Sequence, residues 1–350
     1  MTIRQQIERA SIEKETANGA REFHHAIRRL AKNQGNPELA AAEASRDRAL
    51  PRIVEFLKAA STPGTISGWG SPLAAYAQLQ DAFLLSLRSV SAYEQMLPFM
   101  KSLPVNLQNI AVASGTSGTT VGEGQTKPIT KMTLAQVQVV PKKTTTIVAV
   151  SKELLQFSSS NIFATELTNA VAEAVDASFV SEITNGISPT TSAGGGPVAI
   201  LTDLAALLAS LTVGANSRIF LLVGSDVAKL WSVKTTIQGS LLFPNMTPTG
   251  GEVQGMQVIV TSAVSGSIVA VDASQLAAAS GNIILDTSEE ATLQFDSTPD
   301  SPPTNATNLV SLWQLNFAAI RATRFWAIGR GRSACVAVIS GVTYSANSPA

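Results

Sequence analysis

A polar segment with the pattern of a long β-hairpin runs into an amphipathic helix over residues 119–183, and this stretch limits what the chain can fold into. Residues 134–140, LAQVQVV, alternate apolar and polar side chains, which is typical of a strand with one solvent-exposed face. The strand pattern resumes after Pro141, so we expect the hairpin to end near Val150. A two-stranded hairpin with little apolar surface is marginally stable alone. We therefore expect it to lie on a neighbouring molecule, which favours an assembly subunit.

A helix is predicted from Asn161 to Ile183, with Ser160 or Asn161 as its N-cap and a stop at Asn185-Gly186. Its apolar residues recur at four-residue spacing and its acids lie off that stripe: Phe163, Leu167, Val171, Val175 and Phe179, against Glu166, Glu173 and Glu182. A long helix with one apolar face can serve as a spine on which a sheet packs.

The composition favours burial of much of the surface in contacts. Hydrophobic residues make up 45% of the 350 residues and charged residues only 14%, below the roughly 25% charged share of typical soluble domains. A chain so poor in charge covers its exterior poorly when alone. A large, well-packed monomer remains the alternative. The formal net charge is zero, so the chain as a whole has no basic footprint for nucleic acid.

Charge is distributed unevenly along the chain. Residues 1–60 hold 11 of the 25 Lys and Arg and have a thin helical pattern, which suits a scaffolding segment, an arm or an ordinary helical lobe. A Pro/Gly/Ser-rich linker is expected at 61–72 and a second helix at 73–97. No Lys or Arg occurs between Thr235 and Ile320, a span with seven acids. Opposite charges on separate segments can set the register between subunits.

After a linker at 188–197, helical and strand patterns alternate and predict an α+β module of about 110 residues. We expect a helix at 199–211, a strand at 218–223, a helix capped by Ser225, and strands at 254–260, 267–272 and 282–286. The segment 235–255 is expected to be a surface loop. Trp313, Leu315 and Phe317 alternate as in a strand, and the late strands are expected to return to the helix at 161–183.

No catalytic, cofactor or metal site is predicted. The two histidines, His24 and His25, have no Cys or acid cluster at ligand spacing. Cys335 lies in an apolar run and is expected to be a small buried hydrophobe. Glu289 and Glu290 are adjacent in a strand-like segment, where their side chains would point to opposite faces. No secretory signal or membrane span is predicted, so we expect the chain to fold in the cytoplasm without a membrane partner.

The order of several phrases, more than any one of them, resembles the major capsid proteins of tailed bacteriophages with the HK97-type fold, over roughly residues 73–342. These phrases are VGEGQTKP, VAVSKELL, the helix with AVDASF, QGMQVIVT after GSLLFP, and LNFAAIRATRFWAIGRGRSACVAVI. The resemblance implies an α+β fold with a spine helix, a peripheral domain, an axial domain, an extended β-hairpin loop and an N-terminal arm.

The expected division of the chain follows that fold. It has a charged helical N-terminal segment at 1–60, the N-terminal arm and a helix at 61–111, the extended loop at 112–148, the peripheral domain with the spine helix at 149–199, the axial domain at 200–305, and peripheral strands at 306–350.

The resemblance implies a structural protein, not an enzyme, that assembles into hexamers and pentamers of an icosahedral shell around double-stranded DNA. Implied partners are copies of itself, DNA bound non-specifically on the inner face, and portal and decoration proteins. The implied location is the virion, after assembly in the bacterial cytoplasm. Two alternatives stay open: an encapsulin-like nanocompartment shell, and a soluble α/β enzyme with an unrecognised site.

The candidate inter-subunit contacts are charged residues of the loop and of the C-terminal strands: Glu123, Lys127, Lys131, Lys142, Lys143, Arg321, Arg324, Arg330 and Arg332. The arginines could pair with the acids at 252–300 of a neighbour, or could contact packaged DNA. For any single charge, a solvated surface position is the plainer interpretation.

Overall fold

A computed structural model describes about two thirds of the chain. The described residues are 29, 37–46, 87, 90–104, 109–114, 120–123, 125–126, 129, 133–139, 141–157, 162–195, 197–214, 216–236 and 239–344. The expectations for most of residues 1–86, for the N-cap at Ser160 or Asn161, and for Lys127 and Lys131 lie outside these ranges.

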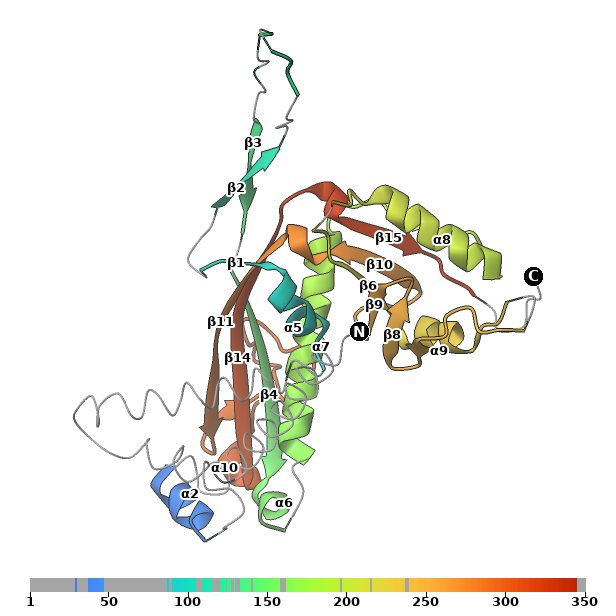
Figure 1. Ribbon diagram of the computed structural model, residues 1–350. Helices are drawn as coiled ribbons and strands as arrows, with labels where there is room; N and C mark the ends of the chain where they lie inside the picture. Colours follow the sequence, from blue (N-terminus) through green and yellow to red (C-terminus); the bar gives the residue numbers. More distant parts are fainter. Residues whose placement is uncertain are drawn as a thin grey trace. The chain divides into compact units, whose positions relative to one another are not determined.

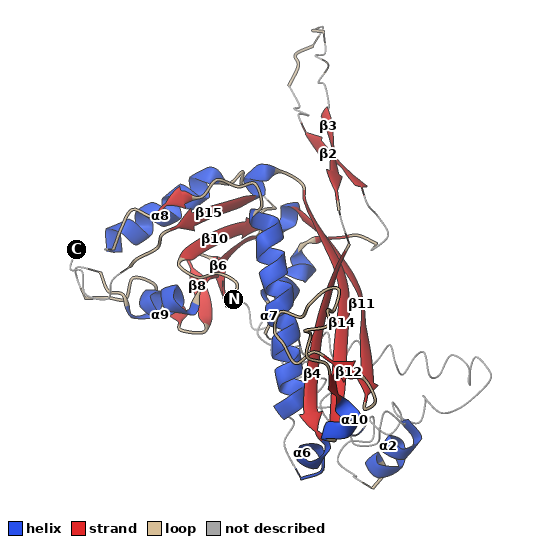
Figure 2. Cartoon of the chain, turned by 180° about the vertical axis from the view of Figure 1, so that it is seen from behind, coloured by secondary structure: helices blue, strands red, loops and turns tan. Residues whose placement is uncertain are grey.

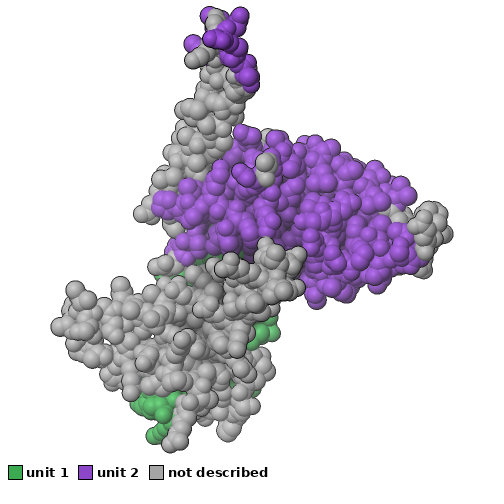
Figure 3. All heavy atoms as spheres, viewed as in Figure 1, with its two compact units in different colours: residues 1–94, 144–174, 282–324 green, residues 95–143, 175–281, 325–350 purple. Residues whose placement is uncertain are grey.

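The chain divides into two compact units, coloured separately in Figure 3. Unit 1 comprises Met1–Glu94, Thr144–Ala174 and Asn282–Arg324, and unit 2 comprises Gln95–Lys143, Val175–Gly281 and Phe325–Ala350. Both units contain helices and strands, which Figure 2 colours separately along the chain. The predicted α+β class is therefore confirmed.

A four-stranded sheet has the order β1-β11-β14-β4 (Figure 1). Its strands are β1 (Lys101–Ser102), β11 (Leu276–Ser288), β14 (Phe317–Arg330) and β4 (Lys142–Ser151). The long helix α7 (Ile162–Thr184) runs alongside β4 in both ribbon views. Leu167, Val171, Val175 and Phe179 are each at most 1% exposed, so the apolar stripe predicted from sequence is the buried face of α7.

The other described elements that lie wholly within unit 1 are short. They are α2 (Pro37–Ala44), α6 (Lys152–Phe157), α10 (Leu312–Leu315), and the paired strands β12 (Thr292–Leu293) and β13 (Val310–Ser311). The helix α5 (Ala92–Met96) begins in unit 1 and is followed in unit 2 by the 3-10 turn η1 (Leu97–Phe99).

Unit 2 contains a seven-stranded sheet with the order β5-β15-β10-β6-β9-β8-β7. The strands are β5 (Thr190–Thr191), β15 (Val336–Ser340), β10 (Ser267–Asp272), β6 (Ile219–Val223), β9 (Met256–Val260), β8 (Gly250–Val253) and β7 (Met246–Thr247). β6 and β9 are parallel, as are β5 and β15, and the other pairs are antiparallel. Short 3-10 turns, η2 (Ala273–Gln275) and η3 (Ser333–Cys335), follow β10 and precede β15.

The helices α8 (Pro197–Ser210) and α9 (Ser225–Val233) pack on one face of this sheet. Strand alternation points Leu221, Val223, Ile268, Ala270, Ala337 and Ile339 into a shared core with Leu204, Leu207 and Trp231 of the helices. The opposite face is buried too: Phe220, Leu222 and Val271 are at most 1% exposed. The Phe99 ring lies 5.4 Å from the Phe220 ring on that face. Burial on both faces explains why these strands read as continuous apolar runs.

Several expectations for the second half of the chain need correction. The segment 235–255 is not a simple surface loop, because it forms β7 and β8 and its Phe243, Met246 and Val253 are buried in the core. Gly251 permits this path: its φ is +151°, and a Cβ there would lie 2.3 Å from the Asn245 carbonyl oxygen. The N-cap of α9 is Gly224, and Ser225 is the first helical residue.

The C-terminal strands also differ from the expectation. Trp313 and Leu315 lie in the short helix α10, 73% and 48% exposed, so their alternation with Phe317 does not mark a strand. We expected residues 306–350 to return together to the long helix. Instead β14 joins the four-stranded sheet, whereas β15 pairs with β10 in the seven-stranded sheet. The expected linker at 188–197 contains β5, which pairs with β15.

Cys335 is fully buried, as predicted, and its Sγ donates to the Arg332 carbonyl oxygen at 2.8 Å. Burial raises the pKa of its thiol, so the thiol stays protonated and unreactive near neutral pH.

A buried carboxylate, Asp272, stabilises unit 2 in a pH-dependent way. It accepts hydrogen bonds from the hydroxyls of Ser217 at 2.6 Å and Ser274 at 2.7 Å, and from the amides of Arg218 and Ser274. Burial alone would raise the pKa of Asp272, but these hydrogen bonds outweigh it and hold the pKa below its usual value.

Replacing Asp272 with asparagine is expected to lower the free energy of unfolding by about 2 kcal/mol at neutral pH, because charge-assisted hydrogen bonds are lost. The folded-state pKa is depressed, so the wild-type advantage is present above the unfolded pKa of about 4 and disappears as the pH falls below it. Urea unfolding of both proteins between pH 3 and 7 measures this difference. A gap of the same size at every pH would contradict the carboxylate's role.

Candidate functional site

A two-stranded hairpin stands as a sheet of its own in unit 2 (Figure 1). It pairs β2 (Asn109–Ser114) with β3 (Thr133–Gln138) in antiparallel register, from Asn109 opposite Gln138 to Ser114 opposite Thr133. The hairpin predicted from sequence is present, but its second strand ends at Gln138 and not near Val150. The strand pattern after Pro141 belongs to β4, which pairs with β14 instead.

The connection between β2 and β3 carries an exposed apolar side chain. Ile129 is 98% exposed, and Thr120, Glu123, Gln125 and Thr126 are exposed around it in the sequence. A fully solvated isoleucine leaves apolar surface in water, and burying that surface against a partner would be favourable. The connection between β2 and β3 would therefore gain free energy from a contact that covers Ile129.

The hairpin is anchored to unit 2 by a small apolar cluster, which we name the root cluster. It consists of the buried Val139, Ala279 and Ala327, with the partly buried Leu103 packed against them. Val139 directly follows β3, and Leu103 follows β1 and donates its amide to the Ala278 carbonyl oxygen at 2.9 Å. Two of the four residues are alanines, so the cluster buries little apolar area.

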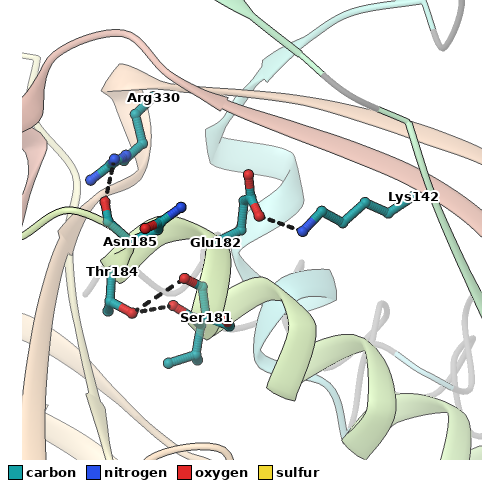
Figure 4. Close-up of polar contacts among 7 residues, drawn as sticks. Lys142, Ser181, Glu182, Thr184, Asn185 and Arg330 are labelled. Atoms are coloured by element: carbon teal, nitrogen blue, oxygen red, sulfur yellow. Dashed lines mark hydrogen bonds and ion pairs between the residues drawn. The ribbon is translucent and has the colours of Figure 1, made fainter.

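The C-terminal end of α7 forms a polar junction (Figure 4). Lys142, the first residue of β4, forms an ion pair with Glu182 in the last turn of α7. The Arg330 guanidinium donates to the carbonyl oxygens of Ile183 at 3.1 Å and Asn185 at 2.6 Å. Carbonyl oxygens at a helix C-terminus lack intrahelical donors and carry partial negative charge, so a guanidinium there stabilises the helix end.

Gly186 ends α7 with a φ of +73°, which fulfils the predicted Asn-Gly stop.

Two further arginines pair with acids inside unit 1. Arg321 donates through Nη2 to Asp286 at 2.6 Å, in a pair whose side chains are 53% and 46% exposed. Arg324 pairs with Glu94, and both side chains are at most 2% exposed. The Arg324 guanidinium also lies 5.4 Å from the centre of the Tyr93 ring. Both arginines therefore have an acid partner within the chain, and their role in contacts between subunits stays a prediction.

The candidate residues thus separate into three groups. Lys142, Arg321, Arg324 and Arg330 have partners within their own units. Glu123, Lys143 and Arg332 are exposed. Lys127 and Lys131 lie outside the described residues. Sequence analysis did not single out the partners Glu94 and Glu182 as such, and no signal in a single sequence assigns a helix acid to a distant base.

Within the described part of the chain, no group of three or more His, Cys, Asp or Glu side chains is placed to hold a metal ion. No helix among the described residues has both the length and the hydrophobicity needed to cross a membrane.

The sequence matches the model of the phage capsid family over residues 77–329, which is more than half of the chain. The chain belongs to the phage capsid family. The resemblance to phage major capsid proteins noted in the sequence is therefore confirmed, and the long helix α7 and the hairpin expected for an HK97-type fold are both present.

A curated relative in this capsid family is the "Capsid polyprotein" of Pseudomonas phage PAJU2. It is 31% identical over 274 residues, which cover 71% of this chain but 41% of the relative. The chain thus spans about two fifths of the length of that relative.

Solved structures from phages are also similar. A chain from Gordonia phage Cozz has a TM-score of 0.48 and 15% identity, covering 71% of this chain and 86% of that one. A chain from Mycobacterium phage Che8 has a TM-score of 0.44 and 17% identity, covering 75% and 92%. The family assignment rests on the sequence match and not on these structures.

Proposed function

We propose that this chain is a major capsid protein that assembles with copies of itself into hexamers and pentamers of an icosahedral shell around double-stranded DNA. The shell would form in the bacterial cytoplasm and become the virion capsid. The role is structural and not enzymatic. Membership of the phage capsid family supports the proposal.

The observation that carries the proposal is the hairpin with the 98% exposed Ile129 in the connection between its strands. A two-stranded ribbon is marginal by itself, and an exposed isoleucine gains free energy when a partner covers it. Copies of the same chain would supply that partner repeatedly around five-fold and six-fold axes through heterologous contacts. Many modest contacts then hold the shell together through avidity.

The exposed charged residues are the proposed polar contacts between subunits: Glu123 and Lys143, with Lys127, Lys131 and Arg332. Lys142, Arg321 and Arg330 would contribute through the segments that they fix. We leave Arg324 out of the proposed interface, because its side chain is buried beside Glu94. Contact with DNA would be non-specific and local, since the net charge of the chain is zero. Portal and decoration proteins are further proposed partners of the shell.

The proposal is tested by expressing the full chain and examining it by size-exclusion chromatography and negative-stain microscopy. We expect hollow closed particles in the void volume, and nuclease-resistant double-stranded DNA in particles from infected cells. Particles that carry protein cargo and no DNA would favour a nanocompartment. A monomer at every concentration tested would refute self-assembly.

A further inference from the structure

Among the described residues, the base of the hairpin meets unit 2 at an apolar cluster and at an ion pair. On the β3 side, the chain meets the root cluster at Val139 and the Glu182 ion pair at Lys142, four residues beyond the last residue of β3. In the part of the chain that the structure describes, the root cluster holds three buried side chains, Val139, Ala279 and Ala327. Apolar stabilisation scales with buried area. A cluster of this size therefore holds the hairpin weakly in any one direction, and a second restraint can decide that direction.

The ion pair between Lys142 and Glu182 is placed to supply that restraint. Lys142 begins β4, where the chain leaves the hairpin, and Glu182 lies one helical turn or less from the end of α7 (Figure 4). The pair therefore connects the base of the hairpin to a helix of 23 residues. Lys142, Glu182 and the C-terminal part of α7 from Val175 onward belong to unit 2.

Arg330 fixes the part of α7 that carries Glu182. Its two hydrogen bonds to the Ile183 and Asn185 carbonyl oxygens hold the residues that directly follow Glu182. Thr184 adds a local bond, donating its hydroxyl to the Val180 carbonyl oxygen at 2.7 Å. Glu182 is thus presented to Lys142 from a helix end that is itself capped.

We propose that Lys142, Glu182 and Arg330 form a charge-dependent anchor that sets the direction of the hairpin and so its readiness for assembly. These are positioning residues, because they orient the hairpin that would contact a neighbouring subunit and do not themselves touch that subunit. The consequence for assembly rests on the proposed function; the anchoring of the hairpin does not.

The anchor is expected to respond to salt. The Lys142 and Glu182 side chains are 37% and 36% exposed, so counter-ions can reach them and weaken their attraction. A pair this exposed adds little to overall stability. Its loss should therefore change the motion of the hairpin more than the melting temperature of the chain.

The test measures amide hydrogen exchange in the full chain, kept below its assembly concentration. In Glu182→Gln and Lys142→Gln, we expect exchange in residues 109–114 and 133–138 to rise about two- to fivefold, the range that an exposed ion pair produces. The core strands β6 and β10 should exchange as in the wild type, and the melting temperature should change little. Raising the salt concentration should give the wild type the same increase.

Two further variants separate the ion pair from general effects of charge. The exchanged pair Lys142→Glu/Glu182→Lys should recover most of the lost protection, as expected for two coupled residues. Lys143→Gln removes the same charge from the next, exposed residue and should leave hairpin exchange unchanged. Wild-type exchange in both single variants would overturn the anchor, and so would a uniform rise across unit 2.

Assembly is scored separately, by light scattering at low salt. If hairpin exchange rises and particles form more slowly, both the anchor and its effect on assembly hold. If hairpin exchange rises in a chain that never forms particles, even as wild type, the anchor stands and the proposed function fails. If the wild type assembles and the variants assemble at the same rate, the anchor does not act on assembly.

Discussion

The variant Ile129→Asp is expected to raise the concentration of chain needed for particle assembly by about 10- to 100-fold. Covering an isoleucine is worth about 1.5–3 kcal/mol, and each 1.4 kcal/mol is a factor of ten in an equilibrium constant. Burying an unpaired carboxylate at the same contact would add to the loss. The unassembled chain should keep its melting temperature, because the Ile129 side chain is already 98% exposed. Light scattering across a concentration series measures the shift.

Two control variants separate apolar contact from charge at the tip of the hairpin. Thr126→Asp adds the same charge at another exposed position without removing apolar surface, so its effect should be smaller. Ile129→Leu keeps the apolar surface and should assemble nearly as the wild type does. If Ile129→Asp assembled at the wild-type concentration, the tip would not be a subunit contact.

Replacing Glu94 with glutamine is expected to lower the free energy of unfolding by about 3–5 kcal/mol, the usual cost of breaking a buried ion pair. The Arg324 side chain is completely buried beside Glu94, so the variant leaves a guanidinium charge in the interior with its carboxylate partner removed. Urea unfolding of the unassembled chain, followed by circular dichroism, measures the loss.

The exposed pair in the same unit is a matched control. Asp286→Asn removes the partner of Arg321, whose pair is about half exposed, and should cost less than about 1 kcal/mol. In the double variant Glu94→Gln/Arg324→Met, most of the stability should return, because neither charge of the pair is left in the interior. Equal losses for Glu94→Gln and Asp286→Asn would show that burial does not govern the effect.

Periodicity in the sequence predicted the helices and strands whose pattern of apolar residues is visible within the element itself. The stripe from Leu167 to Phe179 repeats every four residues over several turns, and it is the buried face of α7. The apolar runs at β6, β9 and β10 were likewise recognisable as strands. The three-residue alternation from Trp313 to Phe317 was too short to distinguish a strand from the single turn of α10.

Partners remote in the sequence could not be predicted. β3 and β4 have similar strand patterns and are separated by three residues, yet β3 pairs with β2 and β4 with β14. The same limit applies to charge. Arg321 and Arg324 stood out as a basic group, but whether their acids lay in the same chain or in a neighbour depended on how distant strands and helices pack.

The position of β15 has a consequence for biosynthesis. β15 lies between β5 and β10, although residues 336–340 are made after every other strand of that sheet. Until residues 336–340 emerge from the ribosome, β10 lacks β15 as its pairing strand on one side, and β5 has no pairing strand. The seven-stranded sheet is therefore completed last, and a chain that stops before residue 336 would lack a complete sheet. If the chain assembles as proposed, we expect only chains extended through β15 to be able to join a particle.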